Sequence, residues 1–158
     1  MKARIALLLM LIYMTSCGLD NGSNEQEIVE LDFTEQNEAD IVAYIAANEL
    51  TATRTASGLY YVIDEPGTGA QPNSNSTITV AYKGYYLNGT VFDESNAEGI
   101  ILPLTNVIAG WREGIPFFKE GGSGMLLIPS HLAYGSYDYS SVPGGSVLIF
   151  DINLIAVN

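Results

Sequence analysis

The side chains on which most enzyme active sites depend are scarce in this sequence. Its 158 residues include one histidine, one cysteine and one tryptophan. His131 is isolated from other metal-ligating residue types, so a solvated loop position is its default interpretation. Asp93 and Glu94 are adjacent, and adjacent strand residues point to opposite faces, so they make a poor acid–base pair. The sequence therefore predicts no metal site, no cofactor and no Ser-His-Asp arrangement.

Aromatic and aliphatic residues in unusual contexts are the remaining candidates for a binding site. Trp111 lies between two glycines, and Tyr134 precedes a glycine in a loop rich in tyrosine and serine. Tyr82 falls on the expected apolar face of a strand, and Phe92 follows a hairpin signal. Taken singly, each is more typical of a core position than of a site. Taken together, they favour an apolar pocket with aromatic walls.

The elements that must position these residues are mostly strands. The segment "TITVAYKGYYL" alternates in polarity. Its expected apolar face consists of Ile78, Val80, Tyr82 and Tyr86. Asn88-Gly89 predicts a tight hairpin turn, and Pro116 limits "WREGIPFF" to one or two helical turns. With "GLYYVI", "MLLI" and "VLIFDINLIAV" as further strands, we expect an α+β domain whose mostly antiparallel sheet curls over one short helix.

An additional short helix is expected before the sheet. The segment "TEQNEADIVAYIAANEL", residues 34–50, has an amphipathic pattern with Thr34 as its predicted N-cap. The predicted apolar face consists of Ile41, Val42, Ile45 and Ala46. This helix either packs on the domain or pairs with a second copy of the chain, and the pattern does not distinguish the two.

The first residues have the pattern of a bacterial lipoprotein leader. Lys2 and Arg4 precede an apolar run, Ile5–Met14, which is shorter than the about 20 residues needed to cross a hydrocarbon core. Small residues then precede Cys17, which predicts cleavage after residue 16 and acylation of Cys17. The alternative is a free thiol in an uncut N-terminal helix. Acylation would anchor the protein in the cell envelope, and we expect an outer-membrane location.

The predicted organisation has four parts. They are a signal peptide at 1–16, a flexible acidic tether at 17–33, a short helix at 34–50 and a folded domain at 57–158. The formal net charge of the chain is −12. Such an acidic surface repels phosphate backbones, which excludes nucleic acid as a partner.

Four spaced motifs closely resemble the FKBP-type peptidyl-prolyl isomerases. They are "VAYKGYYLNGTVFDES", "VIAGWREGI", "LLIPSHLAYGS" and "VPGGSVLIFDINLI", and the resemblance extends roughly from Gly58 to Val157. It implies a twisted antiparallel half-barrel wrapped over one short helix. It also implies an enzyme that accelerates X–Pro isomerisation in folding exported proteins, with unfolded or extended proline-containing polypeptides as partners.

The resemblance also implies a role for each matched residue. Trp111 matches the pocket floor, and Tyr134 matches the tyrosine whose hydroxyl bonds a substrate carbonyl. Asp93 matches the pocket aspartate, which is proposed to orient Tyr82. The remaining implied substrate contacts are Phe92, Ile100, Leu102, Val107, Ile108, Val142 and Phe150. Ile100 and Leu102 stand where the family has aromatic residues, which predicts weakened binding of macrolide inhibitors.

The chemistry of isomerisation fits the scarcity of nucleophiles. Rotation about the X–Pro bond breaks no covalent bond, and its barrier of about 18–20 kcal/mol arises from lost amide resonance. A dry pocket disfavours the dipolar planar amide more than the twisted one. Two alternatives remain open: a holdase that retains extended segments with little turnover, and an envelope scaffold that uses the acidic surface.

Overall fold

The computed structural model describes residues 31–158. The predictions for the signal peptide, for Cys17 and for most of the tether therefore lie outside the described residues. Within residues 31–158, seven strands form one antiparallel sheet in the order β1-β2-β6-β7-β3-β4, with β5 paired to β3. The strands are β1 (Thr53–Arg54), β2 (Tyr60–Glu65), β3 (Thr77–Tyr86), β4 (Val91–Glu94), β5 (Ile100–Pro103), β6 (Gly122–Ile128) and β7 (Leu148–Val157). The helices are α1 (Thr34–Ala47) and α2 (Ala109–Gly114), and the 3-10 turns are η1 (Leu104–Asn106), η2 (Ile115–Phe117) and η3 (Ser130–Leu132).

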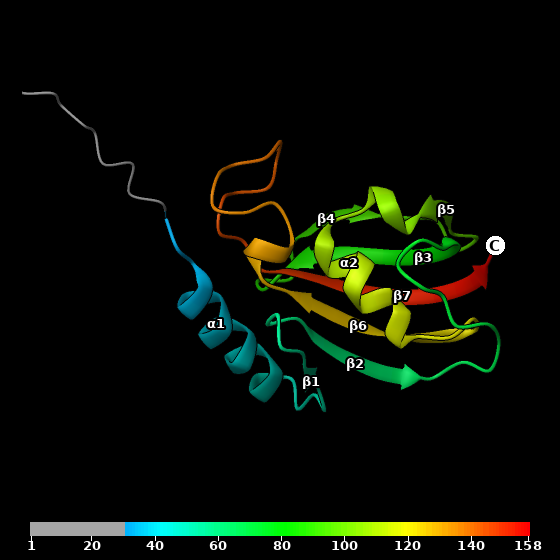
Figure 1. Cartoon of the computed structure of the whole chain (residues 1–158). Helices are drawn as coiled ribbons and strands as arrows, with labels where there is room; N and C mark the ends of the chain where they lie inside the picture. The colour runs from blue at the N-terminus through cyan, green and yellow to red at the C-terminus, as the bar shows by residue number, and fades with distance from the viewer. Residues whose placement is uncertain (1–30) are drawn as a thin grey trace, which may run out of the picture.

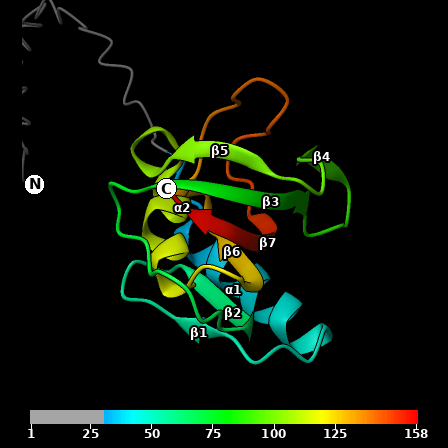
Figure 2. The same ribbon diagram turned by 90° about the vertical axis from the view of Figure 1, so that its right-hand side faces the viewer.

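The sheet twists around α2, as Figure 2 shows. Strand β3 pairs along its length with β7, from Ile78 opposite Val157 to Tyr86 opposite Leu148. Alternate residues of β3 face α2, and Ile78 and Val80 are fully buried there. The hairpin between β3 and β4 turns at Gly89, whose φ of 82° suits glycine. The predicted α+β class, with an antiparallel sheet curled over a short helix, is confirmed.

Helix α2 lies unusually close to β6 because two of its residues are glycines. A Cβ on Gly110 would overlap the side chain of Ile128, and a Cβ on Gly114 would lie 2.6 Å from Leu126 Cδ2. These glycines flank Trp111, which is 4% exposed. The helix ends at Gly114, and Pro116 lies in the following 3-10 turn. The expectation of one or two turns before Pro116 is therefore confirmed.

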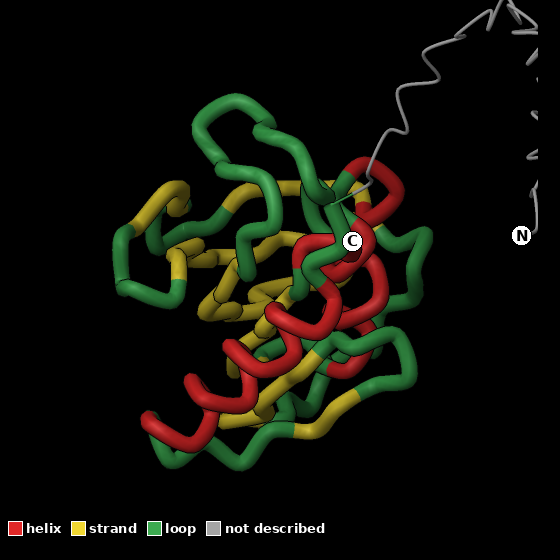
Figure 3. The backbone as a smooth tube through the Cα atoms, turned by 90° about the vertical axis from the view of Figure 1, so that its left-hand side faces the viewer, coloured by secondary structure: helices red, strands yellow, loops and turns green. Residues whose placement is uncertain are grey.

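Helix α1 packs on the opposite side of the sheet from α2 (Figure 3). Ile41 is fully buried in a second apolar cluster that contains Leu127 and Ile149. Their sequence neighbours Leu126 and Phe150 face α2 instead, as strand alternation requires. Within residues 31–158, α1 therefore packs on its own domain, which agrees with the first of the two expected arrangements.

The predicted apolar face of α1 is confirmed at Ile41 and Ile45, which pack in the second apolar cluster, and wrong at Val42 and Ala46, which are exposed. The predicted N-cap is also wrong. Thr34 is not the N-cap, because the helix already includes it and its N–H donates to Asp32 Oδ1 at 2.8 Å. The carboxylate of Asp32 thus satisfies one of the free N–H groups at the helix start. Hydrogen bonding from the side chain of Thr34, together with this backbone bond, lowers the pKa of Asp32.

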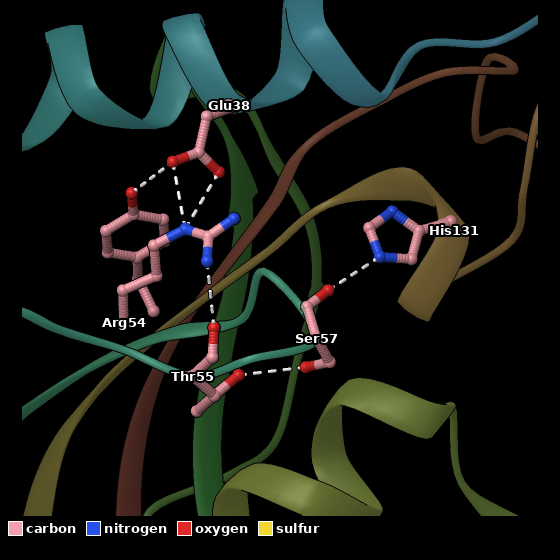
Figure 4. A network of polar contacts seen from close by, with 6 residues as sticks. Glu38, Arg54, Thr55, Ser57 and His131 are labelled. Atoms are coloured by element: carbon pink, nitrogen blue, oxygen red, sulfur yellow. Dashed lines mark hydrogen bonds and ion pairs between the residues drawn. The ribbon is translucent and has the colours of Figure 1, made fainter.

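A polar network connects α1 to the first two strands (Figure 4). Glu38 forms an ion pair with Arg54 of β1 at 2.9 Å and accepts a hydrogen bond from the Tyr60 hydroxyl at 2.6 Å. His131 Nε2 is hydrogen-bonded to the Ser57 carbonyl at 2.8 Å, so the histidine has a structural contact. Within residues 31–158, no helix is long and apolar enough to cross a membrane.

Candidate active site

A cavity of about 430 Å³ opens on the side of the sheet that α2 covers. Its lining residues are Tyr82, Phe92, Asp93, Leu102, Asn106, Val107, Ile108, Trp111, Tyr134, Tyr139 and Phe150. Strands β3, β4, β5 and β7 contribute to the wall, together with α2 and two loops. The fold thus brings together residues that are far apart in the sequence.

The floor of the cavity is a set of aromatic rings that contact one another edge to face. Trp111 meets Tyr82 at a centroid distance of 5.1 Å and an interplanar angle of 89°. It meets Phe150 at 5.2 Å and 85°, and Phe150 meets Phe92 at 5.5 Å and 89°. Such arrangements are favourable because the positive ring edge meets the negative ring face. The rings therefore hold one another in a fixed, apolar surface.

Gly84 makes this ring cluster possible. It lies on the same face of β3 as Tyr82, and a Cβ there would lie 2.8 Å from atoms of both Phe92 and Phe150. A glycine inside a strand marks a place of close approach. The glycine in "AYKGYY" was the sequence signal for this close approach, and it was not recognised from the sequence.

The best-defined polar contact in the cavity joins Tyr82 to Asp93. The Tyr82 hydroxyl donates a hydrogen bond to Asp93 Oδ2 at 2.7 Å. Burial, together with this bond, raises the pKa of Tyr82 well above its ordinary value of 10. The phenol is therefore neutral at physiological pH, and the carboxylate fixes the direction of its hydroxyl.

The indole of Trp111 carries an unsatisfied donor. Its Nε1 is buried and has no hydrogen-bond partner among residues 31–158. Leaving a buried N–H unpaired costs about 1–3 kcal/mol.

Tyr134 lies at the rim of the cavity and stacks on Tyr139. Their ring centroids are 4.7 Å apart with an interplanar angle of 8°. Burial raises the pKa of Tyr134, so its hydroxyl is a neutral donor. Tyr139 and Asn106 also line the cavity, and the sequence analysis did not identify them. The tyrosine-rich loop was a signal for Tyr139, whereas nothing local marked Asn106.

Two of the residues proposed as substrate contacts lie outside the lining. Ile100 begins β5 opposite Val80 and is 37% exposed, whereas Leu102 on the same strand lines the cavity. Val142 is 8% exposed in the core, and its backbone pairs with Tyr139 through two hydrogen bonds of 2.9 Å. The backbone of Val142 therefore holds Tyr139, which lines the cavity. All the other residues that the sequence proposed for the site line this one cavity, including Tyr82, Asp93 and Tyr134.

The lining of the cavity consists mostly of aromatic and aliphatic side chains. Within residues 31–158, no three His, Cys, Asp or Glu side chains gather closely enough to hold a metal ion. Asp93 is the one carboxylate in the lining. The arrangement can grip a small apolar ring, exclude water around it and offer neutral hydroxyls to a carbonyl.

Comparison with known proteins shows the family to which this chain is similar. The profile described as FKBP-type peptidyl-prolyl cis-trans isomerase matches residues 68–155. The chain is 46% identical over 108 residues to the "FKBP-type peptidyl-prolyl cis-trans isomerase FkpA" of Buchnera aphidicola subsp. Schizaphis graminum. That alignment covers 66% of this chain and 43% of the relative, so the chain corresponds to less than half of the relative's length.

Solved structures agree with the profile. The crystal structure of FkpA from Escherichia coli superposes with a TM-score of 0.71 at 34% identity, covering 79% of this chain and 61% of that one. A peptidyl-prolyl cis-trans isomerase from Pseudomonas syringae superposes with a TM-score of 0.68 at 30% identity, covering 79% of this chain and 96% of that one. This chain therefore belongs to the family of FKBP-type peptidyl-prolyl cis-trans isomerases.

Proposed function

We propose that this protein is a peptidyl-prolyl cis-trans isomerase that acts on X–Pro bonds of unfolded or extended polypeptides. The observation that carries the proposal is the aromatic cavity with its Tyr82–Asp93 hydrogen bond, found in a chain of the isomerase family. The pyrrolidine ring of proline is small and apolar and brings no N–H to satisfy. It therefore suits a pocket lined by Trp111, Phe92 and Phe150.

The proposed mechanism needs no covalent intermediate. The rings exclude water from the X–Pro bond, which destabilises its dipolar planar form relative to the twisted form. Tyr134 donates its hydroxyl hydrogen to a substrate carbonyl and holds one side of the bond while the other rotates. Asp93 orients Tyr82 and transfers no proton. A barrier lowered by about 5–7 kcal/mol accelerates exchange roughly four to five orders of magnitude, against an uncatalysed step of tens of seconds.

A protease-coupled isomerisation assay tests this function. We expect wild-type turnover, with kcat/KM reduced roughly tenfold or more in Asp93→Leu and in Tyr134→Phe, since tenfold corresponds to about 1.4 kcal/mol of transition-state stabilisation. Tyr137→Phe is the matched control, because Tyr137 lies in the same loop, is 61% exposed and does not line the cavity. Wild-type protein without turnover would refute the proposal.

A holdase with little turnover is the second candidate function. It is favoured by the exposed aromatic rim, where Tyr134, Tyr137 and Tyr139 are between 39% and 61% exposed. Exposed aromatic rings can retain apolar segments of an unfolded client. Suppression of client aggregation by the wild type, with no isomerisation, supports this candidate. Aggregation suppression that disappears together with turnover in Asp93→Leu supports the enzyme.

We propose further that macrolide inhibitors of the family bind the same cavity. Leu102 supplies an aliphatic wall in place of an aromatic one. An aliphatic side chain offers less stacking surface than a ring, so the affinity is lower than for family members with an aromatic wall.

A lipid anchor at Cys17 is our proposal for the location of the protein. It is supported by the leader pattern, in which a short apolar run and small residues precede the single cysteine. Acyl chains there place the protein in the cell envelope at the outer membrane, where exported chains fold. Radiolabelled palmitate should enter the wild type and not Cys17→Ala; equal labelling of both would refute the anchor.

A further inference from the structure

Asn37 of α1 is a buried polar residue that binds a loop rather than its own helix. It is 1% exposed. Its Nδ2 donates to the Gly145 carbonyl at 2.9 Å, and its Oδ1 accepts from the Ser130 N–H at 2.8 Å. Ser130 and Gly145 lie near opposite ends of the segment between β6 and β7, residues 129–147, here termed the β6–β7 loop. One side chain thus joins both ends of this loop.

The β6–β7 loop carries the rim of the cavity. Both Tyr134 and Tyr139 belong to it. The Gly145 N–H donates to the Gly135 carbonyl at 2.9 Å, and the Gly135 N–H donates to the Ser130 carbonyl at 2.8 Å. Each of the two residues that Asn37 binds is therefore connected, through its other backbone group, by one further hydrogen bond to Gly135, the residue directly after Tyr134.

A second contact brings α1 to the same place. A Cβ on Gly145 would lie 2.6 Å from the ring of Phe33, which directly precedes α1. Gly145 also has a φ of 76°, in the left-handed region that favours glycine. The loop can approach the start of α1 this closely only because residue 145 has no side chain. In Figure 1 the loop, drawn in orange, rises beside the N-terminal end of α1.

The attachment of α1 to the sheet does not depend on Asn37. Ile41 is buried against the sheet, and Glu38 binds Arg54 and Tyr60 (Figure 4). These contacts secure the helix to β1, β2 and the apolar cluster, away from the cavity. The two hydrogen bonds of Asn37 are instead directed at the loop. An amide suits that place, because it offers a donor and an acceptor on two separate atoms.

We infer that Asn37 is a positioning residue, which holds the β6–β7 loop so that Tyr134 lies at the cavity rim. Helix α1 thereby acts on substrate binding without touching the substrate. The inference rests on the proposed function, in which Tyr134 contacts a substrate carbonyl. If the loop is in its binding-competent position in only a fraction of the molecules, the apparent affinity for substrate is reduced to that fraction of its full value. Loss of Asn37 is therefore expected to weaken substrate binding more than it slows the bound reaction.

The experiment compares Asn37→Leu with Glu38→Gln in the full chain. Leucine has a similar size and removes both loop hydrogen bonds, whereas Glu38→Gln weakens the neighbouring contact of α1 with β1. We expect Asn37→Leu to raise KM for a proline-containing peptide about fivefold or more, with kcat changed by less than about twofold. We expect Glu38→Gln to leave both constants near wild type.

A double-mutant cycle with Tyr134→Phe tests whether the effect passes through Tyr134. If Asn37 acts by placing that hydroxyl, the two substitutions together should raise KM much less than the product of their single effects. Additive effects would overturn the inference, as would equal KM changes in Asn37→Leu and Glu38→Gln. Asn37→Ser is the milder variant, used for the same comparison if Asn37→Leu fails to fold.

Two further readouts separate this inference from the proposed enzymatic function. Amide hydrogen exchange without substrate should be faster at Ser130 and Gly145 in Asn37→Leu and unchanged in Glu38→Gln. Peptide affinity can be measured from the fluorescence of Trp111, the only tryptophan. If the wild type binds peptide without turnover, the proposed enzymatic function is refuted, and the comparison of peptide affinity between Asn37→Leu and Glu38→Gln still tests the role of Asn37. Unchanged exchange at both amides overturns the positioning role, whatever the activity.

Discussion

At the scale of single residues, the cavity combines two tyrosine hydroxyl groups that keep their protons with packed aromatic rings that exclude water. Tyr82 is held by Asp93, and Tyr134 faces the rim beside Tyr139. Neither phenol is a base at physiological pH, because burial raises the pKa of both. This chemistry suits a reaction in which a bond rotates and none breaks.

The raised pKa of Tyr82 predicts a loss of stability in alkali. Its contribution is fully present below pH about 10, the pKa of a tyrosine in the unfolded chain. Above that pH the unfolded chain loses the phenol proton while the folded protein keeps it, so the free energy of unfolding falls. We expect the denaturation midpoint to fall more between pH 9 and pH 11 in the wild type than in Tyr82→Phe. Equal falls would contradict the prediction.

The wall of the cavity predicts different effects on macrolide affinity for two substitutions in β5. Leu102 lines the cavity, whereas Ile100 does not. Leu102→Phe adds an aromatic surface to the wall and should tighten binding of a family macrolide by roughly threefold to tenfold, as expected for an aromatic pair worth about 0.5–1.5 kcal/mol. Ile100→Phe should leave the affinity unchanged. Calorimetric titration of a macrolide into both variants measures the two affinities. An equal change in both variants would contradict the prediction.

At the scale of elements, the cavity floor depends on how closely α2 approaches β6. The two glycines of α2 bring the helix backbone against Ile128 and Leu126. Trp111 lies between them and therefore has a fixed depth beneath the cavity. A side chain at either glycine would have to move the helix away from the sheet.

Gly110→Ala tests this close approach. Alanine favours a helix over glycine by about 1 kcal/mol, but overpacking of a well-packed core costs typically 1–3 kcal/mol. Because the added Cβ would overlap Ile128, we expect a net loss of stability in urea unfolding, accompanied by a shift in Trp111 emission. Ala109→Ser, at an exposed position of the same helix, should change neither. If Gly110→Ala were more stable than the wild type in urea, α2 would have to move away from β6 at no cost, which would contradict the prediction.

At the scale of the whole molecule, the sheet has two apolar faces and each is covered by a helix. One cluster surrounds Trp111 and Phe150 beside α2, and the other surrounds Ile41 and Ile149 beside α1. The same loop that closes the first face is held by a residue of α1. The N-terminal helix is thus part of the packed body of the protein.

Removal of α1 should therefore lower the free energy of unfolding of the whole domain. A fragment of residues 57–158 lacks α1 and β1 and would expose Leu127 and Ile149, which are fully buried with α1 in place. We expect it to unfold at a lower denaturant concentration than residues 31–158 and to bind an apolar dye such as ANS. Equal midpoints for the two fragments would show that α1 contributes nothing to stability.

Local sequence patterns were sufficient for most of the elements, but they did not predict β1 or β5. The alternation around Val80 predicted β3, Asn88-Gly89 predicted the hairpin, and Pro116 predicted the end of α2. Each rule depends on residues a few positions apart, so the surrounding fold does not change it. The face of α1 was mispredicted because Val42 is as apolar as Ile41, and only the position of the sheet decides which is buried.

The sequence by itself determined most of the strands, the short helix beside Trp111 and, through four spaced motifs, the family. Only the tertiary structure decided that Tyr139 and Asn106 line the cavity, that Ile100 does not, and that Asn37 binds the loop of Tyr134. The physical reason is distance along the chain. Those contacts join segments whose meeting depends on the twist of the whole sheet, which no local pattern contains.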